Sequence, residues 1–173
     1  MLTGKSIHLR AWREEDLPVL TELRNDVQLQ AQLLARARGS RPEQVREWLH
    51  SRSEKVDSLL FIISDCHSEE AQGFIQVSGL DTVDSHADLG ICLIGKAQGR
   101  GKGGEAISLL ANYLREHWRL RKLNLRVRAD NDVALRCYQK VGFERCGLLR
   151  QHIFIEGGWQ DVALMECFLN KAD

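Results

Sequence analysis

The sequence predicts an α+β fold: one domain, residues 1–173, built on a central mixed, mostly antiparallel sheet of about seven strands with about four helices on its faces. Two observations predict it. Most of the segments that predict strands follow one another directly, as in hairpins. One strand–helix–strand–helix unit lies between them. Helices that alternate with strands in this way cover the faces of a sheet. A chain of 173 residues is long enough to bury one substantial core.

The N-terminal third predicts one strand and two helices. Apolar and polar residues alternate over 6–12, which predicts a strand. Apolar residues at helical spacing predict a helix over 14–29. The segment 40–43, Ser-Arg-Pro-Glu, is typical of a capping box, so a second helix is expected to begin there.

Three strands and the longest helix follow. Residues 59–65 and 73–80 flank a polar connection, as in a hairpin, and a third run covers about 87–94. A helix with one apolar face is expected from near Glu105 to Trp118.

The C-terminal third continues with a strand over 123–127 and a helix over 132–141 that Gly142 ends. Two terminal strands are expected over 143–155 and 159–169, joined by a tight turn at Gly157-Gly158.

The composition excludes several classes of protein. Lys plus Arg and Asp plus Glu each number 24, so no excess of charge argues for nucleic acid or a membrane surface. No apolar run reaches the roughly 20 residues of a spanning helix. The five cysteines are odd in number and include no C-x-x-C pair, which disfavours a zinc site and a disulfide framework. We therefore expect a cytoplasmic protein with no metal and no nucleic-acid or membrane partner.

The most informative segment is the glycine-rich stretch from Gln98 to Gly104, between a predicted strand and a predicted helix. Glycine lets the backbone turn sharply and approach a ligand without obstruction by a Cβ atom. The N–H groups of such a loop, with the positive end of the next helix, bind phosphate. Arg100 and Lys102 add positive charge. The segment therefore predicts a phosphorylated ligand.

A dinucleotide is one candidate ligand, because Gly99, Gly101 and Gly104 match G-x-G-x-x-G. Asp130 would then contact the ribose, although it lies somewhat late in the chain. Successive βαβ units, which that fold needs, are absent before the loop, so an NAD-binding protein is the weaker alternative. A P-loop is excluded, because Gly103 follows Lys102 where Ser or Thr is required.

Two linked motifs support another ligand. Gln98-x-x-Gly101-x-Gly103 resembles the acetyl-CoA loop of the GNAT acetyltransferase superfamily. At the expected separation, the segment from Asn131 through Tyr138 to Phe143 resembles the second motif of the same superfamily.

Both ends of the chain extend the resemblance. Residues 7–10, 15–17 and 152–165 look like the branch that includes ribosomal-protein N-terminal and spermidine acetyltransferases. The resemblance thus covers nearly the whole chain and implies a GNAT-like fold.

The resemblance implies an N-acetyltransferase that moves an acetyl group directly from acetyl-CoA to a primary amine in a ternary complex. The acceptor would be a small-molecule amine, an amino sugar or a protein N-terminus. A CoA-binding regulatory module without turnover is the alternative. The residues expected to bind the cofactor are Ile91, Cys92, Leu93, Gln98, Gly99, Arg100, Gly101, Lys102, Gly103, Gly104, Asn131 and Lys140.

Two residues are expected to move protons. Tyr138 lies seven positions, two helical turns, after Asn131, and a phenol is protonated at neutral pH, as a general acid must be. Asp88 lies where relatives carry a general base, with His86 and Ser78 as lesser candidates. Cys92 and Cys137 are near the expected site, but neither has a sequence-adjacent histidine, which disfavours a covalent route.

The segment expected to shape the acceptor site is basic. Residues 24–55 contain seven cations and four anions. A polyamine pocket should concentrate carboxylates, so this segment favours an anionic acceptor or a protein N-terminus over spermidine, unless it is simply a solvated face. Trp12, Trp48 and the terminal hairpin offer material for a homodimer interface.

Overall fold

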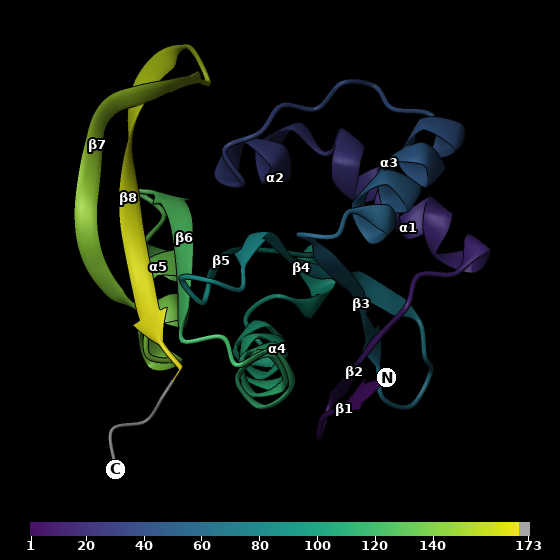
Figure 1. Cartoon of the computed structure of the whole chain (residues 1–173). Coiled ribbons are helices and arrows are strands. Elements are labelled where there is room, and N and C mark those ends of the chain that lie inside the picture. The colour runs from purple at the N-terminus through teal and green to yellow at the C-terminus, as the bar shows by residue number, and fades with distance from the viewer. Residues whose placement is uncertain (170–173) are drawn as a thin grey trace.

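The computed structural model describes residues 1–169, which form an α+β fold around one sheet (Figure 1). Within these residues the sheet has eight strands in the order β1-β2-β3-β4-β5-β6-β8-β7, and β5 and β6 are its parallel pair. The strands are β1 Leu2–Thr3, β2 Ile7–Arg10, β3 Leu59–Asp65, β4 Ala71–Asp81, β5 His86–Leu93, β6 Lys122–Arg128, β7 Glu144–Ile155 and β8 Gly158–Phe168.

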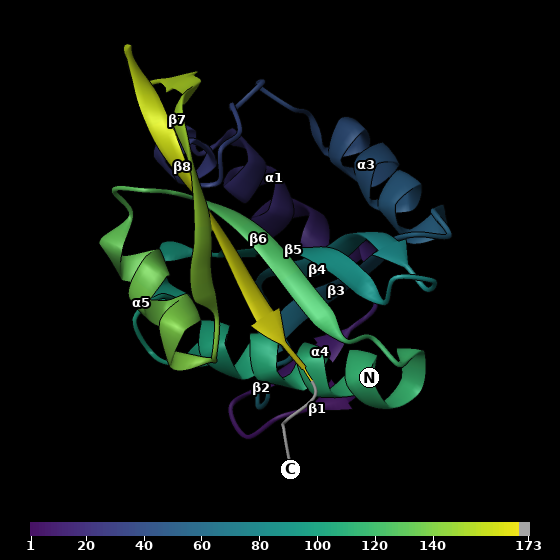
Figure 2. The same ribbon diagram turned by 60° about the vertical axis from the view of Figure 1, so that its left-hand side comes forward.

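The helices cover both faces of this sheet. Figures 1 and 2 show α4 and α5 on one face and α1 and α3 on the other. The helices are α1 Leu17–Asn25, α2 Val27–Gln32, α3 Pro42–Glu54, α4 Lys102–Trp118 and α5 Asp132–Lys140, with short 3-10 turns at Glu14–Asp16 and Gly95–Ala97. The predicted mixed, mostly antiparallel sheet is confirmed, with one more strand and one more α-helix than expected.

Each face has its own apolar core, because alternate residues of a strand point to opposite faces. On β3, Leu60 and Ile62 pack with α1 and α3, whereas Ile63 packs with α4. Burial of these side chains is the main force that holds the helices on the sheet. Among residues 1–169 no helix is both long and apolar enough to cross a bilayer.

The predicted helix over 14–29 is wrong in one respect: it is broken at Asp26. The backbone of Asp26 is extended, with φ −72° and ψ 106°, and its carboxylate accepts a hydrogen bond of 2.9 Å from the N–H of Leu29. Aspartate is a strong N-cap residue, so this contact starts a new helix, α2, instead of continuing α1. The break gives α2 its own direction.

The capping box of α3 is shifted by one residue from the prediction. The N–H of Arg41 donates to Oε1 of Gln44 at 2.9 Å, and Pro42 occupies the first helical position. Ser40 instead exchanges two hydrogen bonds with the side chain of Asn25, at 2.7 and 2.8 Å. These bonds fix the α2–α3 connection to the end of α1.

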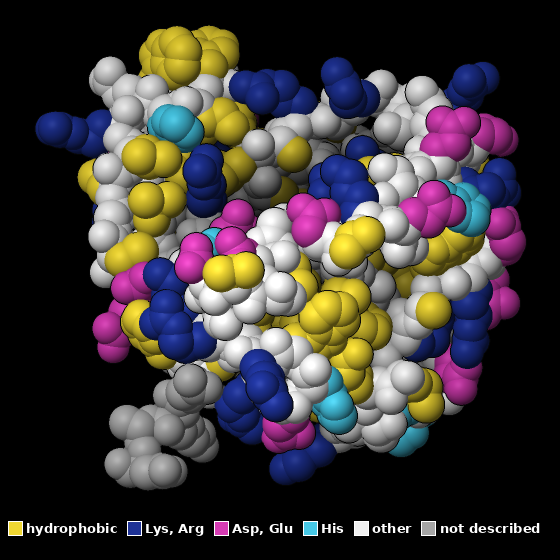
Figure 3. Space-filling model, viewed as in Figure 1, with side chains coloured by type: hydrophobic (Ala, Val, Ile, Leu, Met, Phe, Trp, Pro, Cys, Tyr) yellow, Lys and Arg dark blue, Asp and Glu magenta, His cyan; other side chains and the backbone are white. Residues whose placement is uncertain are grey.

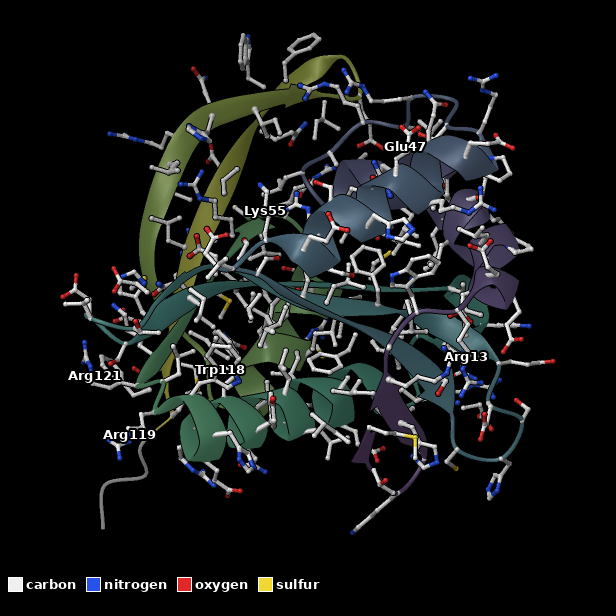
Figure 4. The ribbon with its side chains drawn as sticks, turned by 45° about the vertical axis from the view of Figure 1, so that its right-hand side comes forward. Arg13, Glu47, Lys55, Trp118, Arg119 and Arg121 are labelled. Atoms are coloured by element: carbon white, nitrogen blue, oxygen red, sulfur yellow. The ribbon has the colours of Figure 1, made fainter. Side chains whose placement is uncertain are left out.

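The turn of the terminal hairpin lies one residue earlier than predicted. Ile155 pairs with Gly158, so Glu156 and Gly157 form the turn, with φ values of 55° and 77°. Two consecutive residues of positive φ are typical of the hairpin turn whose twist matches the strands. At the other end of the molecule, Arg119 (φ 53°) ends α4 after Trp118 and leads into β6 (Figure 4).

Trp12 and Trp48, the tryptophans proposed for a homodimer interface, are partly buried within the chain itself. Trp48 packs on Phe74, with ring centroids 5.2 Å apart, and Trp12 contacts the ring of His50. The terminal hairpin does present exposed aromatic side chains, Phe154 and Trp159, whose rings meet edge to face with centroids 5.3 Å apart. A homodimer stays a prediction.

Candidate active site

The parallel strands β5 and β6 separate and leave a cavity between them. They pair only at their beginnings, up to the partners Asp88 and Asn124. Beyond this point lies a cavity of about 1130 Å³, lined on one side by residues 88–93 and on the other by residues 125–127. The separation of two paired strands thus opens the sheet to a ligand from both faces.

The glycine loop lies at the end of this cavity where α4 begins. Gly99 and Gly101 line the cavity and have left-handed backbones, with φ values of 71° and 76°. A Cβ atom at either position would meet no heavy atom within 4 Å, so the space over the loop is free. The first N–H groups of α4 have no acceptor within the helix and carry its positive dipole end. The loop thus combines free space with N–H groups that have no acceptor within the helix, and a phosphate site here stays a prediction.

The next two glycines serve close packing. A Cβ atom on Gly104 would lie 3.2 Å from Cγ1 of Val141, and one on Gly103 would lie 3.5 Å from Leu93. A side chain on Gly104 would therefore require Val141, at the end of α5, to move, whereas a Cβ on Gly103 would make ordinary van der Waals contact. The amide of Gln98 donates to the carbonyl of Leu93 at 2.9 Å and ties the loop to the end of β5.

The structure gives the two cations of the loop different surroundings from those expected. The ammonium of Lys102 binds Oδ2 of Asp65 at 3.0 Å and Oε1 of Gln72 at 2.7 Å, and neither Lys102 nor Arg100 lines the cavity. The side-chain charge of Lys102 is thus neutralised by the β3–β4 hairpin. The ammonium of Lys102 is therefore not free for a ligand in the cavity.

Asn131 and Tyr138 both line the cavity, as their spacing of two helical turns predicts. Asn131 is also the N-cap of α5, because its Oδ1 accepts a hydrogen bond of 3.2 Å from the N–H of Ala134. Within residues 1–169 its amide nitrogen forms no hydrogen bond. Lys140, at the end of α5, lines the same cavity.

Tyr138 presents a protonated phenol to the cavity. Burial raises the pKa of its phenol to about 12, with smaller contributions from Cys137 and Cys92, so it is protonated at neutral pH. The ring packs beside Phe143 at 5.9 Å. No residue in 1–169 forms a hydrogen bond with its hydroxyl, which is therefore available to a ligand in the cavity.

Asp88 and the two thiols near the site differ in exposure. Asp88 lines the cavity at the point where the strands separate and is exposed, as a group that exchanges protons with water should be. Burial raises the pKa of Cys92 to about 12 and also raises that of Cys137. Neutral thiols are poor nucleophiles, so the structure favours direct transfer.

The sequence did not identify the individual residues of one cavity wall, which α2 and β7 form. Figure 3 shows a hollow between the β7–β8 hairpin and the helices α2 and α3. The guanidinium of Arg36 donates to the carbonyl of Phe154 at 2.8 Å and links the two sides. The apolar residues after Asp26, within 27–34, were the signal in the sequence that could have identified this wall. The additional wall residues are Leu29, Gln32, Leu33 and Leu34 from the α2 region and His152 and Ile153 from β7.

The residue considered for a dinucleotide ribose is engaged elsewhere. The carboxylate of Asp130 accepts two hydrogen bonds from Arg128, at 2.9 and 3.0 Å, and these lower its pKa. Arg128 also binds Glu156 at 2.8 Å and so joins β6 to the hairpin turn. With Asp130 occupied and only one βαβ unit among residues 1–169, the dinucleotide alternative fails.

Comparison with known proteins decides the family. The sequence model of the Acetyltransferase (GNAT) domain matches residues 6–144, most of the chain. The chain belongs to the GNAT acetyltransferase family. It is an acetyl-CoA-dependent N-acetyltransferase, and an amine is its acceptor.

Two relatives and one solved structure resemble this acetyltransferase along its length. An uncharacterised N-acetyltransferase of an SPbeta prophage in Bacillus subtilis is 25% identical over 92% of this chain and 88% of the relative. The spermidine N(1)-acetyltransferase of Escherichia coli K12 is 26% identical over 99% and 90%. The spermidine N-acetyltransferase of Vibrio cholerae, solved with CoA and spermine, superposes with a TM-score of 0.88 at 22% identity, covering 96% and 97% of the two chains. At 22% identity, the likeness to the solved structure shows a shared fold.

Proposed function

We propose that the acetyltransferase binds acetyl-CoA in the cavity between β5 and β6 and acetylates a small-molecule amine that enters between α2 and the β7–β8 hairpin. The observation that carries this proposal is that the glycine loop, Tyr138 and Asp88 all line one cavity that opens between two separating strands. The pyrophosphate would rest on the N–H groups of the loop.

The thioester is then directed along β5 toward the point of separation. The backbone of residues 91–93 pairs with β4 but not with β6, and it lies beside the thioester. An N–H group on its open side would polarise the acetyl carbonyl. A preorganised donor of this kind is worth about 3 kcal/mol in the transition state.

Two different side chains would carry out the two proton transfers of the reaction. Asp88, directly or through water, accepts a proton from the ammonium of the acceptor, so that the amine attacks as a neutral nucleophile. Tyr138 donates its proton to the departing thiolate of CoA. The high pKa of the buried phenol keeps the acid in its reactive form across the neutral range.

Two classes of acceptor have specific support. The spermidine acetyltransferases among the relatives favour a polyamine. The cations of residues 24–55 favour an acceptor that carries a negative group, such as an amino sugar phosphate. Both are primary amines and use the same machinery.

Release of CoA thiol from acetyl-CoA, measured over a panel of amines, tests the proposal. The panel contains polyamines, amino sugars and N-terminal peptides. Turnover with a small amine, and its loss in Tyr138→Phe while acetyl-CoA still binds, supports the proposal. Acetyl-CoA binding without turnover on the whole panel would instead support a regulatory module. Turnover confined to the peptides would move the acceptor to a protein N-terminus.

A further inference from the structure

Arg24 is half-buried on the face of the sheet covered by α1 and α3. Its guanidinium carbon lies 4.3 Å from the centroid of the Trp48 ring. Trp48 in turn packs on Phe74 of β4, and Phe74 pairs with Cys92, which lines the cavity. A short chain of packed residues therefore leads from Arg24 to the wall of the cavity at Cys92.

Two further arginines lie beside Arg24. Arg52 follows Trp48 by four residues on α3, so both side chains are on one helix face. Arg38 belongs to the connection that Ser40 fixes to Asn25, the residue next to Arg24. The space-filling view shows Lys and Arg side chains over the α2–α3 region (Figure 3).

No carboxylate of residues 1–169 lies within 4.0 Å of these three guanidinium groups. Glu47, the acid next to Trp48, is exposed on α3 (Figure 4) and forms no such pair. Burial lowers the pKa of Arg24, and the charges of Arg52 and Arg38 lower it further. Three mutually repelling cations, one half-buried, are stabilised by an anion placed between them.

We propose that Arg24, Arg38 and Arg52 form a subsite for a carboxylate or phosphate group of the acceptor, so that the enzyme prefers amines that carry such an anionic group. This inference rests on the proposed function and specifies its substrate class. Guanidinium groups bind both anions through paired N–H donors. The amine of the same molecule would then enter the cavity that Asp88 lines.

Matched pairs of acceptors test the subsite, because their members differ in one anionic group. Lysine is cadaverine with an added carboxylate, and glucosamine 6-phosphate is glucosamine with an added phosphate. We expect kcat/KM to be at least about tenfold higher for the anionic member of one pair, which also identifies the preferred anion. Equal or lower values for both anionic members would overturn the inference, while turnover of any member would still support the proposed function.

Variants test whether these arginines are responsible. Arg24→Gln and Arg52→Gln should each lower kcat/KM about tenfold or more for the anionic acceptor and less than about twofold for its partner. The KM for acetyl-CoA should not change, which separates this subsite from the cofactor phosphates. Arg46→Gln is the control. Arg46 lies on α3, as Arg52 does, but its guanidinium is paired with the carboxylate of Glu14 at 2.7 Å. An equal effect in Arg46→Gln, or none in Arg24→Gln, would overturn the inference.

Two measurements keep the result decisive. If Arg24→Gln lowers the thermal midpoint, Arg24→Lys retains the charge and should keep the preference for the anionic acceptor. Calorimetric binding of glucosamine 6-phosphate and lysine to the CoA-saturated enzyme tests the subsite without catalysis. If either compound binds and Arg24→Gln weakens that binding, the result supports the subsite even without turnover. If neither compound binds, the inference is overturned.

Discussion

Lys102 and Asp65 form an ion pair, with Nζ and Oδ2 3.0 Å apart, that joins the first residue of α4 to the last residue of β3. Both side chains are largely shielded from water, at 13% and 23% exposure. The pair holds the N-terminal turn of α4 against the sheet, and that turn carries the N–H groups proposed for the pyrophosphate. Side chains outside the cavity thus position the loop.

Asp65→Asn should therefore raise the KM for acetyl-CoA by about three- to tenfold and leave kcat within about twofold, because the loop loses an anchor and the reacting groups do not change. Steady-state kinetics with acetyl-CoA as the varied substrate measures this. Asp57→Asn removes an exposed carboxylate without an ion-pair partner in residues 1–169 and is the control. An unchanged KM in Asp65→Asn would show that the ion pair does not position the loop.

The same ion pair predicts a pH dependence of stability. Hydrogen bonds from the backbone of His67, from Lys102 and from the backbone of Ser68 hold the pKa of Asp65 well below its usual range. A carboxyl whose pKa is lower in the folded protein stabilises the fold fully above its unfolded pKa of about 4 and loses that contribution as the pH falls further. Urea unfolding should therefore separate wild type from Asp65→Asn clearly at pH 7 and less at pH 3. A difference that widened toward acid would contradict this assignment.

Removal of the phenolic hydroxyl should affect the chemical step. We expect Tyr138→Phe to lower kcat by about 10²-fold with little change in acetyl-CoA affinity, because the ring still packs on Phe143 but cannot donate a proton. Stopped assays of product and calorimetry of acetyl-CoA binding measure the two quantities. A folded Phe variant with wild-type kcat would exclude Tyr138 from the mechanism.

The backbone of the glycine loop has its own test. Gly101→Ala adds a Cβ into the free space over the loop and strains a left-handed residue by roughly 1–2 kcal/mol. The KM for acetyl-CoA should rise about tenfold or more, because the added methyl group obstructs the pyrophosphate. Gly157→Ala is a matched control, with φ 77° and equally open space but in the distant hairpin turn. It should share the loss of stability and keep the normal KM, and a shared rise in KM would contradict a phosphate role.

The buried pair at the N-terminus should determine stability. Arg10 binds Asp16 through two hydrogen bonds, at 2.8 and 2.9 Å, with side chains that are 5% and 2% exposed. Asp16→Asn leaves the Arg10 charge buried without its counter-ion, which costs about 3–5 kcal/mol of unfolding free energy. Chemical denaturation measures this, with Glu14→Gln on the exposed pair with Arg46 as a control that should change little. A similar loss in both variants would refute the special role of burial.

Local patterns in the sequence allowed most of the fold to be predicted. The strand over 59–65 has the predicted bounds, and α4 and α5 lie within three residues of theirs. These elements follow from periodicity and from glycine, which act within a few residues of the chain. The break at Asp26 was missed, because the side chain of one aspartate decided between one helix and two.

The sequence by itself determined the conformation of the glycine loop and the relation of Asn131 to Tyr138, because glycine freedom and helical spacing are properties of a short segment. Only the tertiary structure decided what surrounds them. The cavity exists because β5 and β6 stop pairing after Asp88, and its second wall is brought there by the turn at Asp26. Long-range contacts likewise decided that the ammonium of Lys102 binds Asp65 and that the guanidinium of Arg24 lies over the Trp48 ring, with no carboxylate of residues 1–169 within 4.0 Å. Each of these contacts joins residues far apart in the chain.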